Sequence, residues 1–253
     1  MPRIARVLMK LLPIAGFVVV WGLITRWEVF SILVLPPPSR VLSAARQLLA
    51  SGDLQVHALA SLKRVAGGFL LGSLLGVILG LGMAHSRFLE RLLRPTIEMF
   101  RPVAALVLIP LVLVWFGIGD TGKILLIAYG SFYPTWTNTF DGARYVDPRL
   151  LHAARSLGCH RHRTLWRVRL PAALPNIATG LSLGIGTAFS VLIAAELMGA
   201  SSGLGWMIAD ARRFFRTEIV LLGMFVIGML GLVTVGLLQA ARDRIGWMRR
   251  AGT

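Results

Sequence analysis

The chain has 253 residues, of which 56% are hydrophobic and 15% are charged, and its mean hydropathy is +0.72. A soluble domain carries about 25% charged residues, so this composition argues against a soluble protein. The formal net charge of +16 would suggest a nucleic-acid partner, but no basic face interleaved with aromatic residues accompanies it, and we expect no nucleic-acid binding.

Long apolar stretches separate the charged residues, and a helix that crosses a bilayer needs about 20 apolar residues. Six stretches predict an all-α integral membrane protein whose single transmembrane domain covers residues 1–253. The predicted spans are residues 11–27, 65–84, 103–119, 124–140, 177–200 and 219–240. The first and third spans are short, and Pro110 lies inside the third.

The distribution of positive charge predicts the orientation. With a cytoplasmic N-terminus, eighteen of the 27 Lys and Arg residues fall on inside segments, as the positive-inside rule requires. Both termini are then cytoplasmic. Arg3, Arg6 and Lys10 could also begin a signal peptide, but no small-x-small cleavage site follows. The first apolar run is therefore interpreted as a retained span.

Residues 35–64 lie outside in this topology. Prolines 36–38 predict a stiff, non-helical exit from the first span, and residues 41–49 predict a short helix on the outer surface. The second span then places four glycines at steps of four, which are Gly68, Gly72, Gly76 and Gly80. Such a ridge favours close helix packing, either within the bundle or between two copies.

Residues 117–123 match the G-x-x-x-x-G-K part of a phosphate-binding loop. The full motif needs Ser or Thr at the next position to hold Mg²⁺, and here that residue is Ile124. The stretch also lies outside and follows no strand. We therefore predict a tight outer turn here, with any ATPase on a separate chain.

The longest inside loop covers residues 141–176. Asp147 followed by Pro148 is typical of a helix start, and Gly158 is placed to end that helix in a left-handed conformation. A second helical piece is predicted to end before Pro171. The residues that share one face of the first helix are Leu150, Leu151, Ala154 and Leu157. This amphipathic helix could dock a partner, lie on anionic lipid, or cover the bundle.

The same loop resembles the EAA loop of ABC importer permeases. That pattern reads E-A-A, three residues, G, nine residues, then I-x-L-P. The matching residues are Ala153, Ala154, Gly158, Leu170 and Pro171, with Val168 for Ile and His152 for Glu. The segments 101–105, 115–119, 195–198 and 203–205 are similar to the nitrate, sulfonate and taurine branch of these permeases.

The resemblance implies a pathway formed by two permease chains, expected to be a homodimer, above two ATPase subunits that bind ATP and Mg²⁺. A periplasmic or lipid-anchored binding protein would deliver the solute across the inner membrane. The implied ATPase-docking residues are Leu150, Leu151, Ala153, Ala154, Leu157, Gly158, Leu170 and Pro171. This chain itself would hold no cofactor and catalyse no reaction. The implied solute is a small anion such as an aliphatic sulfonate, taurine or nitrate, with a thiamine precursor as the alternative.

Polar side chains in the fourth and fifth spans are candidates for the pathway. They are Ser131, Tyr133, Asn138, Thr187, Ser190 and Glu196. Such side chains equally form hydrogen bonds between helices. Glu196, the only charge of the fifth span, lies near its outer end, which favours a structural or gating hydrogen bond. The outer Arg212, Arg213 and Arg216 could attract an anion or form a solvated face.

Other classes of protein fit the sequence less well. Cys159, His160 and His162 are too few ligands for a metal site, and we expect none. A secondary transporter would show inverted repeats and several intramembrane charges, and no repeat is visible. A membrane-embedded enzyme would need paired His, Asp or Glu residues inside the spans, which are also missing from the sequence.

Overall fold

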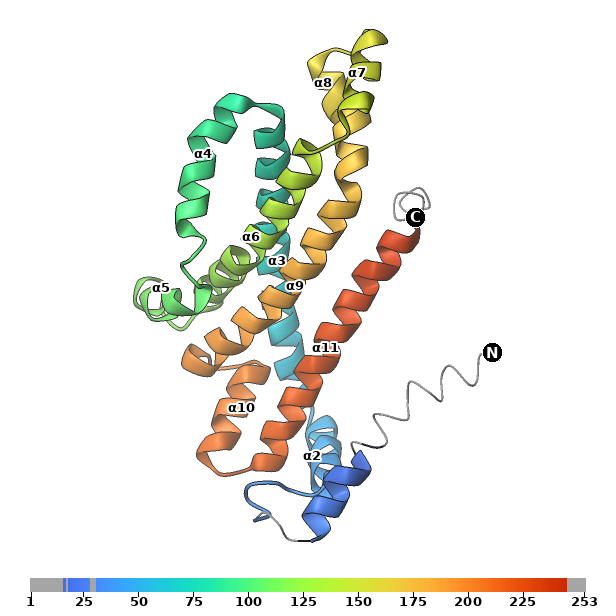
Figure 1. The fold of residues 1–253 in the computed structure, drawn as a ribbon. Helices are drawn as coiled ribbons and strands as arrows, with labels where there is room; N and C mark the ends of the chain where they lie inside the picture. Colours follow the sequence, from blue (N-terminus) through green and yellow to red (C-terminus); the bar gives the residue numbers. More distant parts are fainter. Residues whose placement is uncertain (1–15, 17, 28–30, 245–253) are drawn as a thin grey trace, which may run out of the picture.

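A computed structural model of the protein describes residues 16, 18–27 and 31–244, and every regular element in this part of the chain is helical (Figure 1). The elements in chain order are α2 (Pro38–Ser51), α3 (Asp53–His85), α4 (Arg87–Phe100), the 3₁₀-helix η1 (Ala105–Leu108), α5 (Ile109–Phe116), α6 (Asp120–Arg144), α7 (Pro148–Ser156), α8 (Arg161–Thr164), the π-helix η2 (Leu165–Arg169), α9 (Leu170–Gly199), α10 (Leu204–Arg213) and α11 (Thr217–Arg244). The prediction of an all-α protein is confirmed for these residues.

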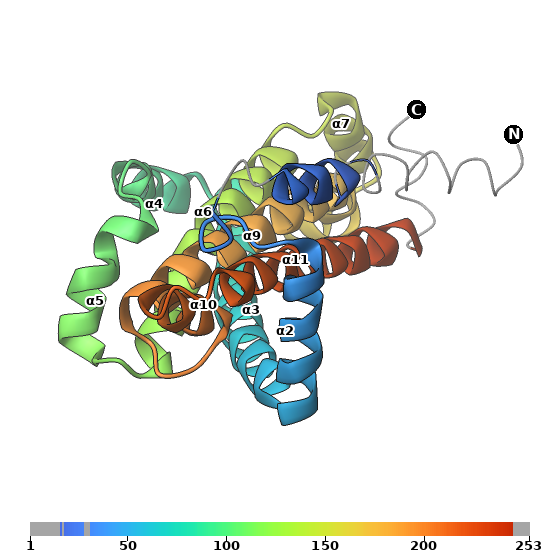
Figure 2. The ribbon, with the colours of Figure 1, turned by 90° about the horizontal axis from the view of Figure 1, so that it is seen from below.

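Helix α6 lies between α3 and α9 and makes its most extensive contacts with these two helices (Figures 1 and 2). The core between them is tightly packed, since Ile127 and Leu192 are 0% exposed. A Cβ atom added at Gly72 would lie 2.2 Å from the carbonyl oxygen of Ala128 in α6. The glycine ridge of α3 is therefore a contact face within the bundle, one of the two predicted uses.

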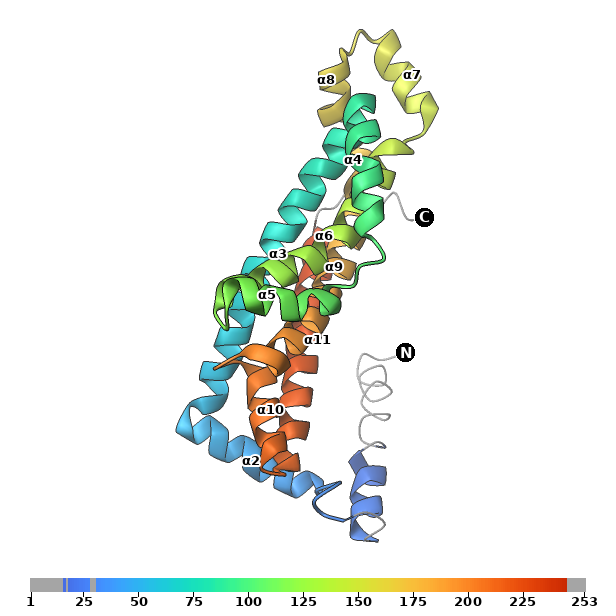
Figure 3. The same cartoon turned by 90° about the vertical axis from the view of Figure 1, so that its left-hand side faces the viewer.

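The molecule is elongated, with α7 and α8 at one end and α2 at the other (Figure 3). We call these the α7 end and the α2 end. Helix α10 packs against α9 and α11 near the α2 end, and α2 packs against α11. Gly52, whose φ of 84° is left-handed, allows the sharp turn between α2 and α3.

Three helical segments are long and apolar enough to cross a membrane: Asp53–His85, His162–Gly199 and Thr217–Ala240. Helix α4 together with η1 and α5 would make a fourth crossing, bent by 76° at the break between them. These segments contain the predicted spans 65–84, 177–200 and 219–240. Helix α6 contains the predicted span 124–140, but its polar residues lower its hydropathy, so it is not among the segments that are apolar enough to cross a membrane. Residues 16 and 18–26 are helical and residue 27 forms a turn, whereas residues 11–15 and 17 of the predicted span 11–27 lie outside the described residues.

Of the predicted third span, residues 103–119, the structure makes residues 105–116 helical, as η1 followed directly by α5, which is too short to cross a membrane alone. The chain leaves the helical conformation after Arg101, where Pro102 follows, and resumes it as η1 and the short α5. Pro102 lacks an amide hydrogen and so cannot donate the next helical hydrogen bond, which explains the break. Residues 87–100, predicted as an inside segment because of their charges, form helix α4 instead.

Two further boundaries differ from the prediction. The helical piece before Pro171 does not end there, because η2 continues directly into α9. Pro171 is the second residue of α9 and lies directly after the π-helical turn of η2. Residues 204–213, predicted as outer loop, form α10, and α3 begins at Asp53, twelve residues before the predicted span.

Candidate functional site

Helix α7 has the start and the end that the sequence predicts. The backbone amide of Arg149 donates a hydrogen bond to Oδ1 of Asp147 at 2.8 Å, which caps the first turn. Gly158 has a φ of 73°, and the amide of Cys159 donates to the carbonyl oxygen of Ala154 at 3.0 Å. Left-handed glycine and this bond together close the C-terminal turn.

The apolar residues of α7 divide between two faces. Leu150 and Leu157 are 52% and 83% exposed, and Ala153 lies between them on the outward face. Leu151 is half-buried, and Ala154 is 7% exposed because it packs against the protein's own chain. The outward face therefore offers an apolar surface to a partner, whereas the inward face holds α7 in place. Leu170 and Pro171 are half-buried at the start of α9.

Close to α7 lies a polar hollow of about 470 Å³. Its lining residues are Ala84, His85, Arg87, Arg144, Leu151, Cys159, Thr164 and Arg169. The Arg169 guanidinium donates a hydrogen bond to the carbonyl oxygen of Ala84, which ties the start of α9 to the end of α3. This hollow brings arginines from α4, α6 and η2 together with His85 of α3 behind α7.

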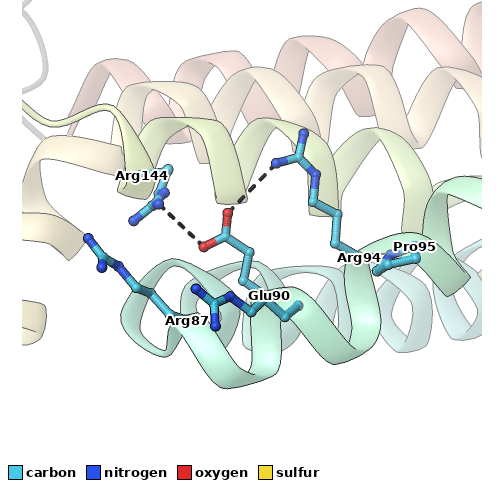
Figure 4. A pocket seen from close by; sticks show the side chains of 6 residues that line it. Arg87, Glu90, Arg94, Pro95 and Arg144 are labelled. Atoms are coloured by element: carbon cyan, nitrogen blue, oxygen red, sulfur yellow. Dashed lines mark ion pairs between the residues drawn. The ribbon is translucent and has the colours of Figure 1, made fainter.

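A second hollow, of about 490 Å³, lies between α4 and α6 (Figure 4). It is lined by Arg87, Glu90, Arg91, Arg94, Pro95 and Arg144. Glu90 forms ion pairs with Arg94 at 3.7 Å and with Arg144 at 3.4 Å. Four arginines face this hollow and a single carboxylate lines it, so the hollow is strongly electropositive.

A third hollow, of about 550 Å³, lies farther along α4 and is largely apolar. Three of the predicted pathway residues line it, namely Tyr133, Thr187 and Ser190. Arg101 stands at its edge, with its guanidinium carbon 5.7 Å from the centre of the Tyr133 ring. The structure therefore gathers aromatic, hydroxyl and cationic groups from α4, α6 and α9 around one space.

The other predicted pathway residues lie elsewhere. Ser131 is 0% exposed and donates to the carbonyl oxygen of Ile127 at 2.9 Å. Asn138 is half-buried and donates to the carbonyl oxygen of Pro134 at 2.8 Å. Both side chains satisfy backbone carbonyls of their own helix, and neither lines the third hollow.

Glu196 is 1% exposed and belongs to a buried cluster toward the α2 end. Its carboxylate accepts hydrogen bonds from Ser61 at 2.9 Å, from Arg64 at 2.6 Å and from the amide of Gly205 at 2.8 Å. Arg64 also donates to Asp120 at 2.7 Å. The cluster joins α3, α6, α9 and the start of α10 through fully partnered groups.

Arg64 was not recognised from the sequence, because it falls in a segment predicted to lie outside the membrane. A search for a cation to match the buried carboxylate of Glu196 would have found it. The lysine of the phosphate-loop-like stretch, Lys123, is 3% exposed and donates to the carbonyl oxygens of Ile118 and Gly119. It holds the turn between α5 and α6, in line with the predicted tight turn.

Comparison with known proteins gives consistent matches. The family model for the inner membrane component of binding-protein-dependent transport systems matches residues 72–246. SsuC of Bacillus subtilis, provisionally named an aliphatic sulfonates transport permease protein, is 43% identical over 224 residues, or 88% of this chain and 81% of SsuC. The taurine transport system permease protein TauC of Escherichia coli is 38% identical over 252 residues, or 97% of this chain and 92% of TauC.

A solved structure has the same fold. It is a chain of the MetNI methionine ABC transporter in an inward-facing conformation, with a TM-score of 0.59 and 20% identity over 77% of this chain and 94% of that chain. At this identity the likeness concerns the fold alone. The family match over residues 72–246, with the identities to SsuC and TauC, shows that the chain belongs to the inner membrane components of binding-protein-dependent transport systems and is a permease of an ABC importer.

Proposed function

We propose that this permease imports a small organic sulfonate, taurine or a related alkanesulfonate, across the bacterial inner membrane. The observation that carries the proposal is the 38% identity to TauC, a permease named for taurine transport, over 97% of the chain. Nitrate and a thiamine precursor are the alternatives that the sequence left open.

We further propose six membrane crossings. They are the helical residues 16 and 18–26, then α3, the bent pair of α4 with α5, α6, α9 and α11. The α7 end then lies in the cytoplasm and the α2 end outside, with both termini cytoplasmic. The distribution of arginine supports this orientation, because the basic hollows near α7 would face the cytoplasm.

Helix α7 is the proposed contact with the ATPase. Its exposed Leu150, Ala153 and Leu157 form an apolar face, and buried apolar surface is the main favourable term in protein association. Two copies of this chain would stand above two ATPase subunits, which bind ATP and Mg²⁺. Closure of the ATPase dimer would displace α7 and shift the permease between two packing arrangements, inward-open and outward-open.

Uptake by the reconstituted transporter tests the solute. The permease, its ATPase and its binding protein would be placed in liposomes, and ATP-dependent entry of labelled taurine would be measured. We expect taurine uptake that unlabelled alkanesulfonates inhibit and that nitrate or a thiamine precursor does not. Uptake of only a neutral or cationic solute would contradict the proposal.

The single cysteine tests the orientation. Cys159 follows α7, so a membrane-impermeant thiol reagent should label it in inside-out vesicles and not in intact spheroplasts. Because a docked ATPase could cover Cys159, vesicles stripped of the ATPase serve as the control. Labelling from the outer face would reverse the proposed topology.

A further inference from the structure

The charged residues of α4 follow one line along the helix. Arg87, Arg91, Arg94, Glu98 and Arg101 are separated by four, three, four and three residues, a spacing that places side chains on a single helical face. Glu90 belongs to the same face, three residues after Arg87 and four before Arg94. Arg101 continues the helical conformation, with a φ of −52° and a ψ of −47°. Four of these six positions carry a permanent positive charge, and Glu90 and Glu98 carry the two carboxylates.

This arginine stripe faces α6. The guanidinium of Arg94 lies 5.6 Å from the centre of the Phe140 ring, and that of Arg101 lies 5.7 Å from the Tyr133 ring. The exposed apolar residues of α4, including Phe88 and Met99, lie on other faces of the helix. The stripe therefore lines the second hollow, which Figure 4 shows, and through Arg101 the third hollow; we call these two hollows together the α4–α6 groove.

In the proposed topology, in which α4 and α5 form one crossing, the stripe extends into the membrane. Helix α4 has 14 residues, which corresponds to about 21 Å at 1.5 Å per residue, whereas the hydrocarbon core is about 30 Å thick. If Arg87 lies near the surface, Arg101 lies well inside. A charged side chain at that depth is costly unless it is paired or faces a water-filled space.

The stripe lacks enough carboxylates to be neutral. Glu90 and Glu98 bind Arg94 and Arg144. Among the described residues, no carboxylate lies within ion-pairing distance of Arg87, Arg91 or Arg101. The groove therefore holds excess positive charge at a depth where such charge needs water or an anion.

We propose that the α4–α6 groove is the inner part of the solute pathway and that its arginine stripe selects for an anion. Arg101 would contact the anionic group in the third hollow, where apolar walls accept the carbon chain of the solute. Arg94, Arg91 and Arg87 would then draw the anion toward the α7 end. A guanidinium presents several donors to the oxygens of one anion, which suits a sulfonate. The inference rests on the proposed function and adds the residues that recognise the charge.

The test measures the charge preference of the groove without transport. In a Cys159→Ser background, Ser190→Cys places the only thiol of the permease in the third hollow. The assembled transporter in phosphatidylcholine nanodiscs is treated with methanethiosulfonate reagents that end in a sulfonate or in a trimethylammonium group. The ratio of the two reaction rates, followed by mass spectrometry of the permease, cancels the intrinsic reactivity of the thiol.

We expect the sulfonate reagent to react faster, and Arg101→Gln to lower the ratio about tenfold, because removing one nearby charge slows the anion and speeds the cation. Arg101→Lys should keep the ratio within about threefold, and Arg46→Gln, on the exposed side of α2, should leave it unchanged. An unchanged ratio in Arg101→Gln would overturn the proposal. So would failure of both reagents to react, with or without ATP, because the groove would then be closed to water.

Two other outcomes distinguish a groove that binds lipid from one that binds solute, and an error in the proposed solute from an error in the proposed groove. If nanodiscs made of phosphatidylglycerol protect the thiol from both reagents, a lipid headgroup occupies the groove and the proposal is overturned. If the parent transporter fails to import any sulfonate while the ratio still depends on Arg101, the proposed solute is wrong and the anion-selecting groove stands.

Discussion

The arginines on the two sides of α6 differ in their partners. Toward α3 and α9, Arg64 is 3% exposed and its guanidinium is bonded to Glu196, Asp120 and Ser202. Toward α4, Arg91 and Arg101 are exposed and have no carboxylate partner among the described residues. A cation whose donors are all used by fixed partners holds helices together. A cation that is left with free donors beside a hollow is available to a ligand.

The largest effect is expected where the buried cluster is broken. Glu196→Ala leaves Arg64 buried without its main partner, which should lower the free energy of unfolding by about 3–5 kcal/mol. Thermal unfolding of the purified permease in detergent measures this loss. The double variant Arg64→Met with Glu196→Leu should recover much of it, because no unpaired charge remains. Unfolding of Glu196→Ala at the parental temperature would show that the cluster contributes little to stability.

The glycine ridge on the same side should come next. In Gly72→Ala the new Cβ would meet the Ala128 carbonyl oxygen at 2.2 Å, so α3 and α6 must separate. Overpacking of this kind costs about 1–3 kcal/mol. The matched control is Gly186→Ala in α9, where a Cβ meets no atom within 4 Å and alanine favours the helix. If both variants unfold at the same temperature, close approach at Gly72 does not limit stability.

A smaller change in stability is expected at the end of α7, with a large effect on coupling. Gly158→Val puts a β-branched residue at a φ of 73°, at a local cost of about 1–2 kcal/mol. The bundle should unfold as the parent does, while ATPase retained on purification and solute uptake both fall. Ala153→Trp should have the same two effects by blocking the exposed face of α7.

The variant Ala154→Trp serves as the comparison for Ala153→Trp. Ala154 is 7% exposed, so Ala154→Trp should disturb the permease's own packing and lower its unfolding temperature as well. Arg46→Ala on α2 should alter neither ATPase retention nor uptake. Normal ATPase binding by both Gly158→Val and Ala153→Trp would remove α7 as the coupling element.

The smallest change in stability is expected in the groove. Arg91→Gln removes an exposed charge that has no carboxylate partner among the described residues, so the free energy of unfolding should change by less than about 0.5 kcal/mol. Thermal unfolding beside Glu196→Ala gives the direct comparison of the two sides of α6. A loss as large as that of Glu196→Ala would mean that Arg91 is a structural residue after all.

Local sequence rules predicted local features well. Asp147, Pro148 and Gly158 were enough to place both ends of α7, because capping depends on neighbours in the chain. The glycines of α3 predicted a packing face because their spacing of four residues places them on one side of the helix. Sequence did not predict α4, because its arginines resemble those of an inside loop until the hollows beside them are known.

Contacts between distant residues were beyond the sequence. Arg64 and Glu196 are 132 positions apart, and no local pattern pairs them. Six pathway candidates could be selected by polarity, but polarity alone does not distinguish Tyr133 and Ser190, which line a hollow, from Ser131, which bonds to its own helix. Only the relative placement of α4, α6 and α9 separates the two kinds.

The helical segment from His162 to Gly199 connects the two ends of the molecule without a break. It contains 38 residues, which corresponds to about 57 Å at 1.5 Å per residue. One extremity adjoins α7, and the other carries Glu196 with its partners from α3 and α10. In the proposed topology these two ends lie at opposite surfaces of the membrane, so this one helical segment would link the ATPase-facing end to the buried carboxylate.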